Sequence, residues 1–245
     1  MPSRAPEVRT PRWIALLVAL IGAPALAQVT VNVPATSDPY LAGMPNGSTC
    51  CSGDSAPAQS PVPVTGIAVT PGTILTFSAS GAMHFEPGPL SPTPDGSFTF
   101  TTVATNGISG ATWPVDALVG VFLDGNLPTA TATPPALDFG STGLGTSFAL
   151  LTPALKQVFF IGDGRTGTGS GAAQSFVVPA GATRLFLAVS DGVGWFNNVG
   201  SFSVTVTPLA APPVPVADIP LLAPWLLVLM SAAVGAFALR SLRRR

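Results

Sequence analysis

A short loop near the end of the chain carries three oxygen-bearing side chains that could hold a metal ion. Asp191, Asn197 and Asn198 lie in the stretch SDGVGWFNNVG, between the apolar run RLFLAVS and the alternating segment SFSVTVT. Hard cations such as Ca²⁺ select oxygen ligands, and Ca²⁺ takes about six to eight of them. A calcium site here therefore needs backbone carbonyls and a second loop. The alternative is a plain turn, because Asp-Gly and Asn-Asn tolerate left-handed backbone.

The rest of the sequence offers no recognisable catalytic set. His84 is the only histidine, and hydrolases that use serine, cysteine or a metal usually need histidine as base or ligand. No G-x-S-x-G nucleophile elbow is present. The stretch GDGRTG at 162–167 matches the letters of the dinucleotide motif, but loop and strand residues follow it where that motif requires a helix. We therefore predict that the protein is not an enzyme.

The elements that position the loop are predicted to be strands. Short β-branched and aromatic runs, separated by Gly and Pro turn signals, recur between residues 61 and 208. About eight strands in roughly 150 residues predict an all-β domain, a β-sandwich or jelly roll. The expected strands are TGIAV, TILTFSAS, SFTFTTV, ALVGVFL, KQVFFIG, QSFVVP, RLFLAVS and SFSVTVT. Residues 126–155 are an unusually long connection, which we expect to fold over one end of the sandwich.

The segment before the predicted sandwich, residues 28–60, is rich in Pro, Ser, Gly and Ala, and we expect it to be irregular. It contains the only two cysteines, Cys50 and Cys51, which are adjacent. In an oxidising compartment they can form a vicinal disulfide, pair between chains or stay free. The sequence does not decide among these states, and we assign the pair no function.

The N-terminal end predicts export. Three arginines within the first twelve residues precede the apolar run WIALLVALIGAPALA, which ends in the small-x-small pattern Ala25-Leu26-Ala27. This is the form of a secretory signal, so residues 1–27 are predicted to be removed before Gln28. The alternative is an N-terminal anchor helix, for which the apolar run is short.

The C-terminal end predicts one membrane-spanning helix in residues 219–245. No charged residue occurs from Ile219 to Leu239, and about 20 apolar residues suffice to cross a bilayer. Four arginines follow between Arg240 and Arg245, and positive residues stay on the cytoplasmic side, so the middle of the chain is predicted to face outward. Residues 209–218 read as a stiff proline-rich spacer. The alternative, a buried core helix, fits the terminal arginines poorly.

The predicted exported part is acidic. Between Gln28 and Ala217 the chain has three Lys or Arg residues and nine Asp or Glu residues, which gives a net charge of −6. Nucleic-acid binding requires a basic face, so this balance argues against a nucleic-acid partner. It is compatible with a bound metal cation.

Several segments together resemble the PA-I-type galactophilic lectin family, and lectin-like domains of that family in bacterial surface proteins. The segments are VTPGTILTFSASGAMHFEPGPLSPTPDG, ALVGVFLDG and FFIGDG followed by SFVVPAGATRLFLAVSDGVGWFNNVGSFSVTV. The resemblance covers Thr65 to Pro208, and its most specific part is the Asp…Asn-Asn…Gly-Ser-Phe-Ser-Val ending. It implies a β-sandwich with one calcium at its end, where hydroxyl groups of a sugar complete the coordination.

Carried over residue by residue, the resemblance implies the ligands of that calcium. Asp191, Asn197 and Asn198 would supply side-chain oxygens and, through the ion, would meet the sugar. Phe85, where the family has a tyrosine, and Trp195 would supply backbone carbonyl oxygens. The loop from Asp191 to Asn197 is one residue shorter than in the lectin.

The sugar contacts of the family are less well matched. Asn106 falls near a sugar-contacting position of the family. The histidine and glutamine that contact sugar there have no clear counterpart, and Val103 falls near the first of them. The 126–155 insertion is foreign to the family.

The tail resembles a second family, the IPTL variant of the PEP-CTERM exosortase sorting signals. Its stretch IPLLAPWLLVLM departs from the pattern I-P-T-L-x-x-W at one position, where Leu221 replaces threonine. The resemblance implies cleavage near the motif by an exosortase-type membrane enzyme and transfer to the cell surface. The matching residues are Ile219, Pro220, Leu222 and Trp225, with Arg243, Arg244 and Arg245 at the end of the chain.

The sequence therefore predicts an exported, C-terminally sorted bacterial cell-surface protein with a lectin-like β-sandwich. The expected cofactor is calcium. The expected partners are an exosortase-type sorting enzyme, the membrane through the C-terminal helix, and a galactose-like glycan or exopolysaccharide. The alternative is a structural surface or biofilm-matrix protein that binds neither metal nor sugar, in which the Asp191 loop is only a turn.

Overall fold

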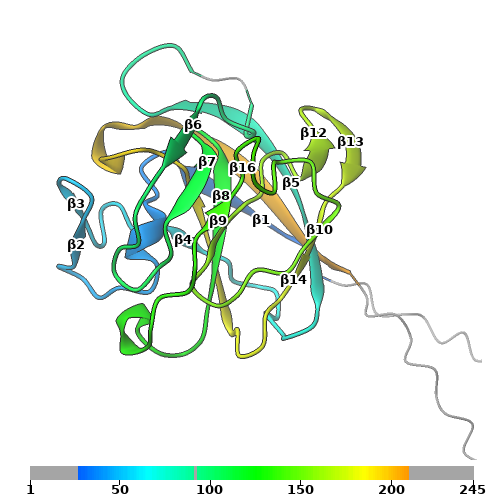
Figure 1. The fold of residues 1–245 in the computed structure, drawn as a ribbon, viewed down its shortest axis with the longest axis horizontal. Helices are drawn as coiled ribbons and strands as arrows, with labels where there is room; N and C mark the ends of the chain where they lie inside the picture. Colours follow the sequence, from blue (N-terminus) through cyan, green and yellow to red (C-terminus); the bar gives the residue numbers. More distant parts are fainter. Residues whose placement is uncertain (1–26, 91–92, 210–245) are drawn as a thin grey trace, which may run out of the picture.

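The computed structural model describes residues 27–90 and 93–209, which form an all-β protein with three single-turn 3₁₀ helices (Figure 1). These turns are η1 (Pro39–Leu41), η2 (Pro128–Ala130) and η3 (Trp195–Asn197). Within this part of the chain, no helix is long and apolar enough to cross a bilayer. The predicted signal peptide, proline-rich spacer and sorting helix lie outside the described residues, apart from their boundary positions.

The larger sheet is built on one long antiparallel pair. Its five strands, in spatial order, are β1 (Val29–Pro34), β16 (Val199–Leu209), β5 (Ile74–His84), β14 (Ser175–Val177) and β10 (Leu150–Leu151). β5 and β16 pair over eleven positions, from Ile74 opposite Leu209 to His84 opposite Val199. The alternation expected in β16 is present, because Phe202, Val204 and Val206 are fully buried.

A smaller sheet faces the same core. Its strands, in spatial order, are β11 (Val158–Phe160), β8 (Leu118–Leu123), β15 (Arg184–Val189) and β4 (Val62–Pro63). All of β8 is buried, as expected for a continuous apolar run. The two sheets meet through aromatic side chains, and the ring centroids of Phe159 in β11 and Phe176 in β14 are 5.5 Å apart.

Three further small sheets lie around these two. One has three strands, β6 (Thr99–Thr101), β7 (Ala111–Pro114) and β9 (Leu137–Asp138). The others are hairpins formed by β2 (Thr49–Cys50) with β3 (Asp54–Ser55) and by β12 (Arg165–Gly167) with β13 (Ser170–Ala173). These small sheets raise the strand number of the described residues well above the expected eight.

The strand expectations hold for seven of the eight segments, which contain β5, β6, β8, β11, β14, β15 and β16. TGIAV at 65–69 is not a strand, because β4 forms just before it and only Ile67 and Val69 pack against the core. Residues 28–60 also differ from expectation. Residues 29–34 form β1, which pairs with β16 from Val29 opposite Val206 to Pro34 opposite Ser201.

The insertion at 126–155 folds back onto the domain and contains η2, β9 and β10. Polar side chains hold it through its backbone carbonyls. Gln157 Nε2 donates to Pro135 O at 2.9 Å, and Gln174 Nε2 donates to Thr146 O and Phe148 O at 2.8 Å each. Because these amides bond to backbone, they fix the path of the insertion without depending on its side chains.

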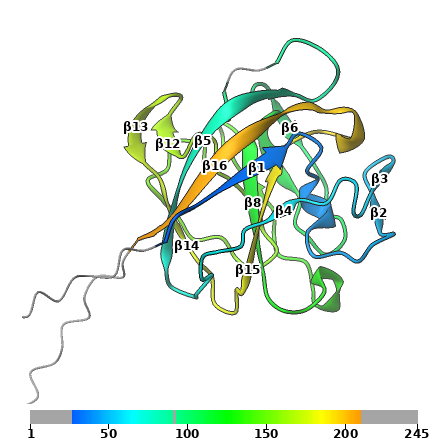
Figure 2. The ribbon, with the colours of Figure 1, turned by 180° about the vertical axis from the view of Figure 1, so that it is seen from behind.

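The two ends of the described chain lie together. Val29 at the start of β1 pairs with Val206 near the end of β16, and Figures 1 and 2 show both strands leaving the molecule at the same side. The opposite end of β16 begins at Val199, directly after the Asp191–Asn198 loop. A strand rises about 3.3 Å per residue, so this loop lies roughly 30 Å from the chain ends.

Candidate functional site

The loop between β15 and β16 is shaped by one glycine and one tryptophan. Gly194 has φ +85°, a left-handed conformation that favours glycine, and it starts η3. The next residue, Trp195, is fully buried, and its indole Nε1 donates to Val189 O at 2.8 Å. Because Trp195 is fixed in the core, Asn197 and Asn198 are held at the end of the sheets.

Asp191 is the charged group of this loop. Its side chain is 3% exposed. Oδ1 accepts a hydrogen bond from the Gly192 N–H, whereas Oδ2 receives none from the described residues. Burial raises the pKa of Asp191 to about 6, against the favourable effects of the Gly192 N–H, the Asn198 side chain and the Val193 N–H. Asp191 is therefore a buried carboxyl group whose Oδ2 accepts no hydrogen bond from the described residues.

The two asparagines present further unpaired oxygens. Asn198 is 6% exposed, and its Nδ2 donates to Ala35 O at 3.1 Å, which fixes the orientation of the amide. Its Oδ1 receives no hydrogen bond from the described residues, and the same is true of the buried Oδ1 of Asn197. The three side chains predicted as calcium ligands thus share the same unusual property.

The strand register brings the predicted second loop to this one. His84 at the end of β5 pairs with Val199, so the next residue, Phe85, lies opposite Asn198 if the antiparallel register continues. Trp195 O accepts the Asn198 N–H at 3.1 Å, which leaves the carbonyl a second lone pair. Both predicted backbone ligands therefore belong to segments at this end of the sheets. The assignment of all five residues to a metal stays a prediction.

Asp54 supports the loop and was not expected from the sequence. It is fully buried in β3, and its two carboxylate oxygens accept the N–H groups of Trp195 and Phe196 at 2.9 and 2.8 Å. Burial raises the pKa of Asp54, and these two N–H groups oppose that shift. The N-terminal segment, expected to be irregular, thus holds the start of η3. The stretch STCCSGDS contains no signal for such a long-range contact.

Asp116 is a second unexpected acidic group. It lies in the turn between β7 and β8, is 1% exposed and has φ +67°. Its Oδ1 receives no hydrogen bond from the described residues, and burial raises its pKa. Ser190, the neighbour of Asp191, fixes this turn, because Asp116 N–H donates to Ser190 O at 3.0 Å and Ala117 N–H donates to Ser190 Oγ at 2.7 Å.

Asn106 follows Thr105, which lines the same pocket as Gly192, Val193 and Trp195 of the loop. Its Nδ2 donates to Tyr40 O at 3.2 Å and to Thr49 O at 3.3 Å, so its amide hydrogens bind the N-terminal segment. Only its Oδ1 remains for a ligand. In its predicted contact with a sugar, Asn106 could therefore only accept a hydrogen bond from a sugar hydroxyl, through Oδ1.

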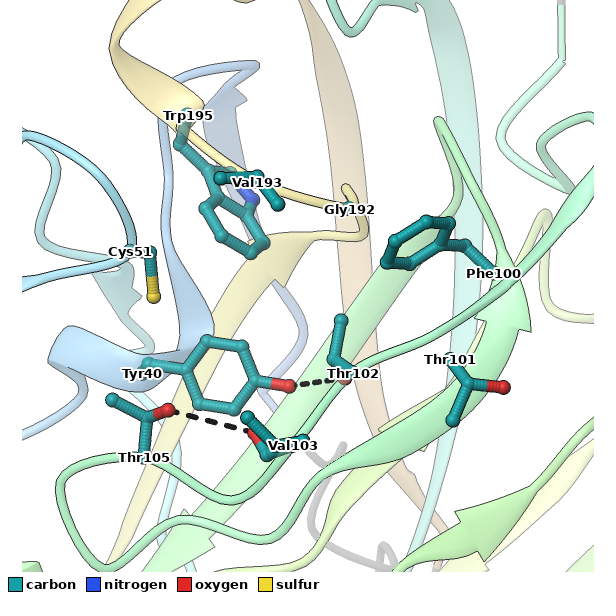
Figure 3. Close-up of a pocket in the computed structure, with 10 residues that line it drawn as sticks. All are labelled: Tyr40, Cys51, Phe100, Thr101, Thr102, Val103, Thr105, Gly192, Val193 and Trp195. Carbon is teal, nitrogen blue, oxygen red and sulfur yellow. Dashed lines mark hydrogen bonds between the residues drawn. The ribbon is translucent and has the colours of Figure 1, made fainter.

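A pocket of about 270 Å³ adjoins the loop (Figure 3). It is lined by Gly192, Val193 and Trp195 of the loop, by residues 100–103, and by Tyr40 and Cys51 of the N-terminal segment. Tyr40 Oη donates to Thr102 Oγ1 at its wall. Its rim carries exposed apolar side chains, with Phe100 39%, Val103 79% and Val193 62% exposed. Apolar walls with hydroxyl groups between them suit a ring that has one apolar face and polar edges.

The cysteines form a vicinal disulfide between Cys50 and Cys51, so one of the three states left open by the sequence is present. The carboxyl group of Asp38 lies beside it, within 4.8 Å of both sulfur atoms. Burial raises the pKa of Asp38 to about 8, with the Tyr40 N–H opposing and the charges of Asp54 and Asp191 adding to the shift. A metal would need thiolates here, and the bonded sulfurs do not provide them.

The proposed sorting residues, from Ile219 to Arg245, lie outside the described part of the chain. No protein-family model matches the sequence, and no similar curated protein is found. The function of the site is therefore argued from its geometry.

Proposed function

We propose that this chain is an exported, C-terminally sorted cell-surface protein that displays a lectin-like β-sandwich. The 190–198 loop binds calcium, and the calcium binds a galactose-like glycan or exopolysaccharide. The protein is not an enzyme. Its route to the surface, by signal peptide and exosortase-type sorting, rests on the sequence patterns at the two ends.

One observation carries the calcium proposal: Asp191 Oδ2 and the Oδ1 atoms of Asn197 and Asn198 are buried and receive no hydrogen bond from the described residues. Leaving a buried polar group unpaired costs about 1–3 kcal/mol, and more for a charged one. A turn would be more stable with these oxygens exposed or paired. A doubly charged cation compensates all three, and oxygen is the ligand atom that calcium selects.

The surroundings of the loop support glycan binding. Protein-bound calcium that is partly coordinated by protein can take two sugar hydroxyls directly. The adjoining pocket offers apolar walls at Phe100 and Val193. The loop also lies at the end of the sheets opposite Val29 and Leu209, so a domain tethered through its C-terminal end would present this site away from the tether.

Terbium luminescence tests the calcium site directly. Tb³⁺ replaces Ca²⁺ in oxygen sites and emits when a nearby tryptophan absorbs light. Trp195 is in the loop, and Trp113 Nε1 donates to Asp191 O at 3.1 Å. We expect sensitised emission from the purified full-length protein in detergent, displaced by Ca²⁺ and absent in Asp191→Ala.

The matched control is Asp138→Ala, which removes a carboxylate of β9 that accepts the Gly140 N–H and makes no hydrogen bond to the loop. It should keep the Tb³⁺ signal. A wild-type signal no stronger than that of Asp191→Ala would contradict the calcium proposal and favour the structural alternative. A glycan array with and without Ca²⁺ then tests the sugar: calcium binding without any calcium-dependent glycan signal would remove the lectin part alone.

A further inference from the structure

The acidic residue Asp116 is not among the ligands that the lectin resemblance implies, and no other function accounts for its placement. Four buried carboxyl groups lie in this part of the molecule, and three of them have bonding that explains their positions in part or in full. Asp54 has both oxygens bonded, while Asp38 and Asp191 each have one oxygen bonded to a backbone N–H. Asp116 has a weak contact of 3.5 Å from Ser97 Oγ to its Oδ2 and lies beside the Phe85 N–H, whereas its Oδ1 receives no hydrogen bond from the described residues.

The backbone places Asp116 directly beside Asp191. Ser190 bonds the β7–β8 turn through its carbonyl, its N–H and its hydroxyl, with Ser190 N donating to Ala117 O at 2.8 Å. From the other side, Phe85 lies next to Asp116, since its N–H favours the charged form of that carboxyl group. Asp116 is thus enclosed by the same segments that supply the predicted ligands Asp191 and Phe85.

No basic side chain of the described residues accounts for this charge by a hydrogen bond. Lys156, Arg165 and Arg184 donate to backbone carbonyls of other segments, and Lys156 also donates to Thr131 Oγ1. His84 is near enough to favour the ionised form of Asp116, but its Nδ1 is engaged with the backbone of Glu86. Two neighbouring buried carboxylates repel each other, and this repulsion destabilises the fold unless a cation binds between them.

We infer that Asp116 is a second carboxylate ligand of the cation held by Asp191, so that the protein supplies two negative charges to the site. This inference rests on the proposed calcium site and adds to it a residue outside the lectin pattern. Its physical consequence is selectivity for a divalent over a monovalent cation, because two carboxylates neutralise a double charge. Asp116 Oδ1, which receives no hydrogen bond, is the ligand atom.

Two substitutions test the inference without disturbing the turn. Asp116→Asn keeps the shape and tolerates the left-handed backbone, and Asp116→Gly suits φ +67° and removes the side chain. In the full-length protein we expect the Kd for Ca²⁺ to rise at least tenfold in Asp116→Asn and further in Asp116→Gly. Without calcium, both variants should melt at a higher temperature than the wild type, because a buried carboxyl group with an unpaired oxygen has been removed.

The control is Asp163→Asn, which removes a buried charge whose two oxygens are bonded by the N–H groups of Arg165 and Gly169. It should melt at a lower temperature and keep the wild-type Kd. If both Asp116 variants bind Ca²⁺ within fivefold of wild type while Asp191→Asn does not bind, Asp116 is no ligand, although the proposed calcium site stands. A lower melting temperature of both variants with unchanged Kd would show instead that Asp116 is a structural partner of His84. Absence of Ca²⁺ binding by the wild type would overturn both proposals.

Discussion

Two clusters of oxygen atoms lie at opposite ends of β8, and they differ in whether the chain supplies a cation to them. Beyond Phe122, Lys156 Nζ donates to four oxygens of the insertion at 2.6–3.3 Å. These are Pro128 O, Thr131 O, Thr131 Oγ1 and Ala132 O. At the Leu118 end, one side-chain oxygen each of Asp116, Asp191, Asn197 and Asn198 receives no hydrogen bond from the described residues.

The two clusters differ in the charge of their oxygen atoms and in the donors that the chain supplies to them. The oxygens around Lys156 are neutral carbonyls and one hydroxyl, and the chain supplies the positive charge that orders them. The oxygens at the Asp191 end include carboxylates, and the lysine and arginine side chains of the described residues bond elsewhere. The first arrangement stabilises the fold by itself. The second has no such donor among the described residues, and this is why we propose that it binds a cation from solution.

The largest expected effect is at the Lys156 end. Lys156→Met should lower the free energy of unfolding by about 3–5 kcal/mol, because it removes four hydrogen bonds from one charged donor at once. Chemical denaturation of the full-length protein measures this. Arg165→Met, at an exposed residue with one bond to Gly171 O, should cost less than about 1 kcal/mol. Equal losses in the two variants would mean that the Lys156 cluster does not hold the insertion.

The second effect belongs to the Asp191 end. Calcium at a hundredfold excess over its Kd should stabilise the wild type by about 2.7 kcal/mol. Lys156→Met should retain this gain, since Lys156 lies at the other end of β8, whereas Asp191→Ala should lose it. Thermal melts with calcium and with chelator measure both. A calcium response that survives Asp191→Ala would place the cation elsewhere.

The acidic end should also make stability depend on pH. Burial raises the pKa of Asp38 to about 8 in the folded protein, above its usual value, so the folded state retains a proton that the unfolded state releases. The contribution of Asp38 to the free energy of unfolding is therefore fully present at low pH. It falls as pH rises from about 4 to 8, by about 1.4 kcal/mol per pH unit.

Asp38→Asn isolates this effect, because an amide stays neutral throughout. Denaturation between pH 6 and 8 should show a shallower decline in the variant than in the wild type, with both measured in chelator. The same slope in both proteins would mean that Asp38 does not hold a proton in this range.

The smallest effect separates a structural from a sugar-contacting role for Asn106. Asn106→Ala should lower the free energy of unfolding by about 1 kcal/mol, since it removes the bonds to Tyr40 O and Thr49 O. Calcium affinity should be unchanged. If a glycan is found on the array and Asn106→Ala loses its binding without losing stability, Asn106 contacts the sugar. That result would contradict a purely structural role for Asn106.

The sequence was informative where a side-chain pattern is local. Alternation in SFSVTVT predicts β16, and the continuous apolar run ALVGVFL predicts β8. β1 was missed because the segment 28–60 was judged by its overall Pro, Ser, Gly and Ala content, although the valines of VTVNVP alternate with polar residues as in a strand. Its pairing with β16, across more than 160 residues of chain, is not visible in the sequence. TGIAV has strand composition but lies outside the paired positions of β4, so tertiary pairing overrode its propensity.

The candidate site divides in the same way. Asp191, Asn197 and Asn198 were predicted from residue types within one loop. Asp54 and Asp116 were not, because nothing in their neighbouring residues distinguishes them from ordinary turn acids. Their importance arises only when β3 and the β7–β8 turn fold against η3 and Ser190.

The sequence by itself determined an all-β chain, acidic in its middle, with oxygen-bearing residues on one late loop, because strand periodicity and residue chemistry are local properties. The tertiary structure decided which of those oxygens are buried and unpaired, and which acidic residues join them. Hydrogen-bond partners are set by groups far away in the chain. Lys156 donates hydrogen bonds to oxygens of the insertion. The unpaired oxygens at the Asp191 end receive no hydrogen bond from the described residues.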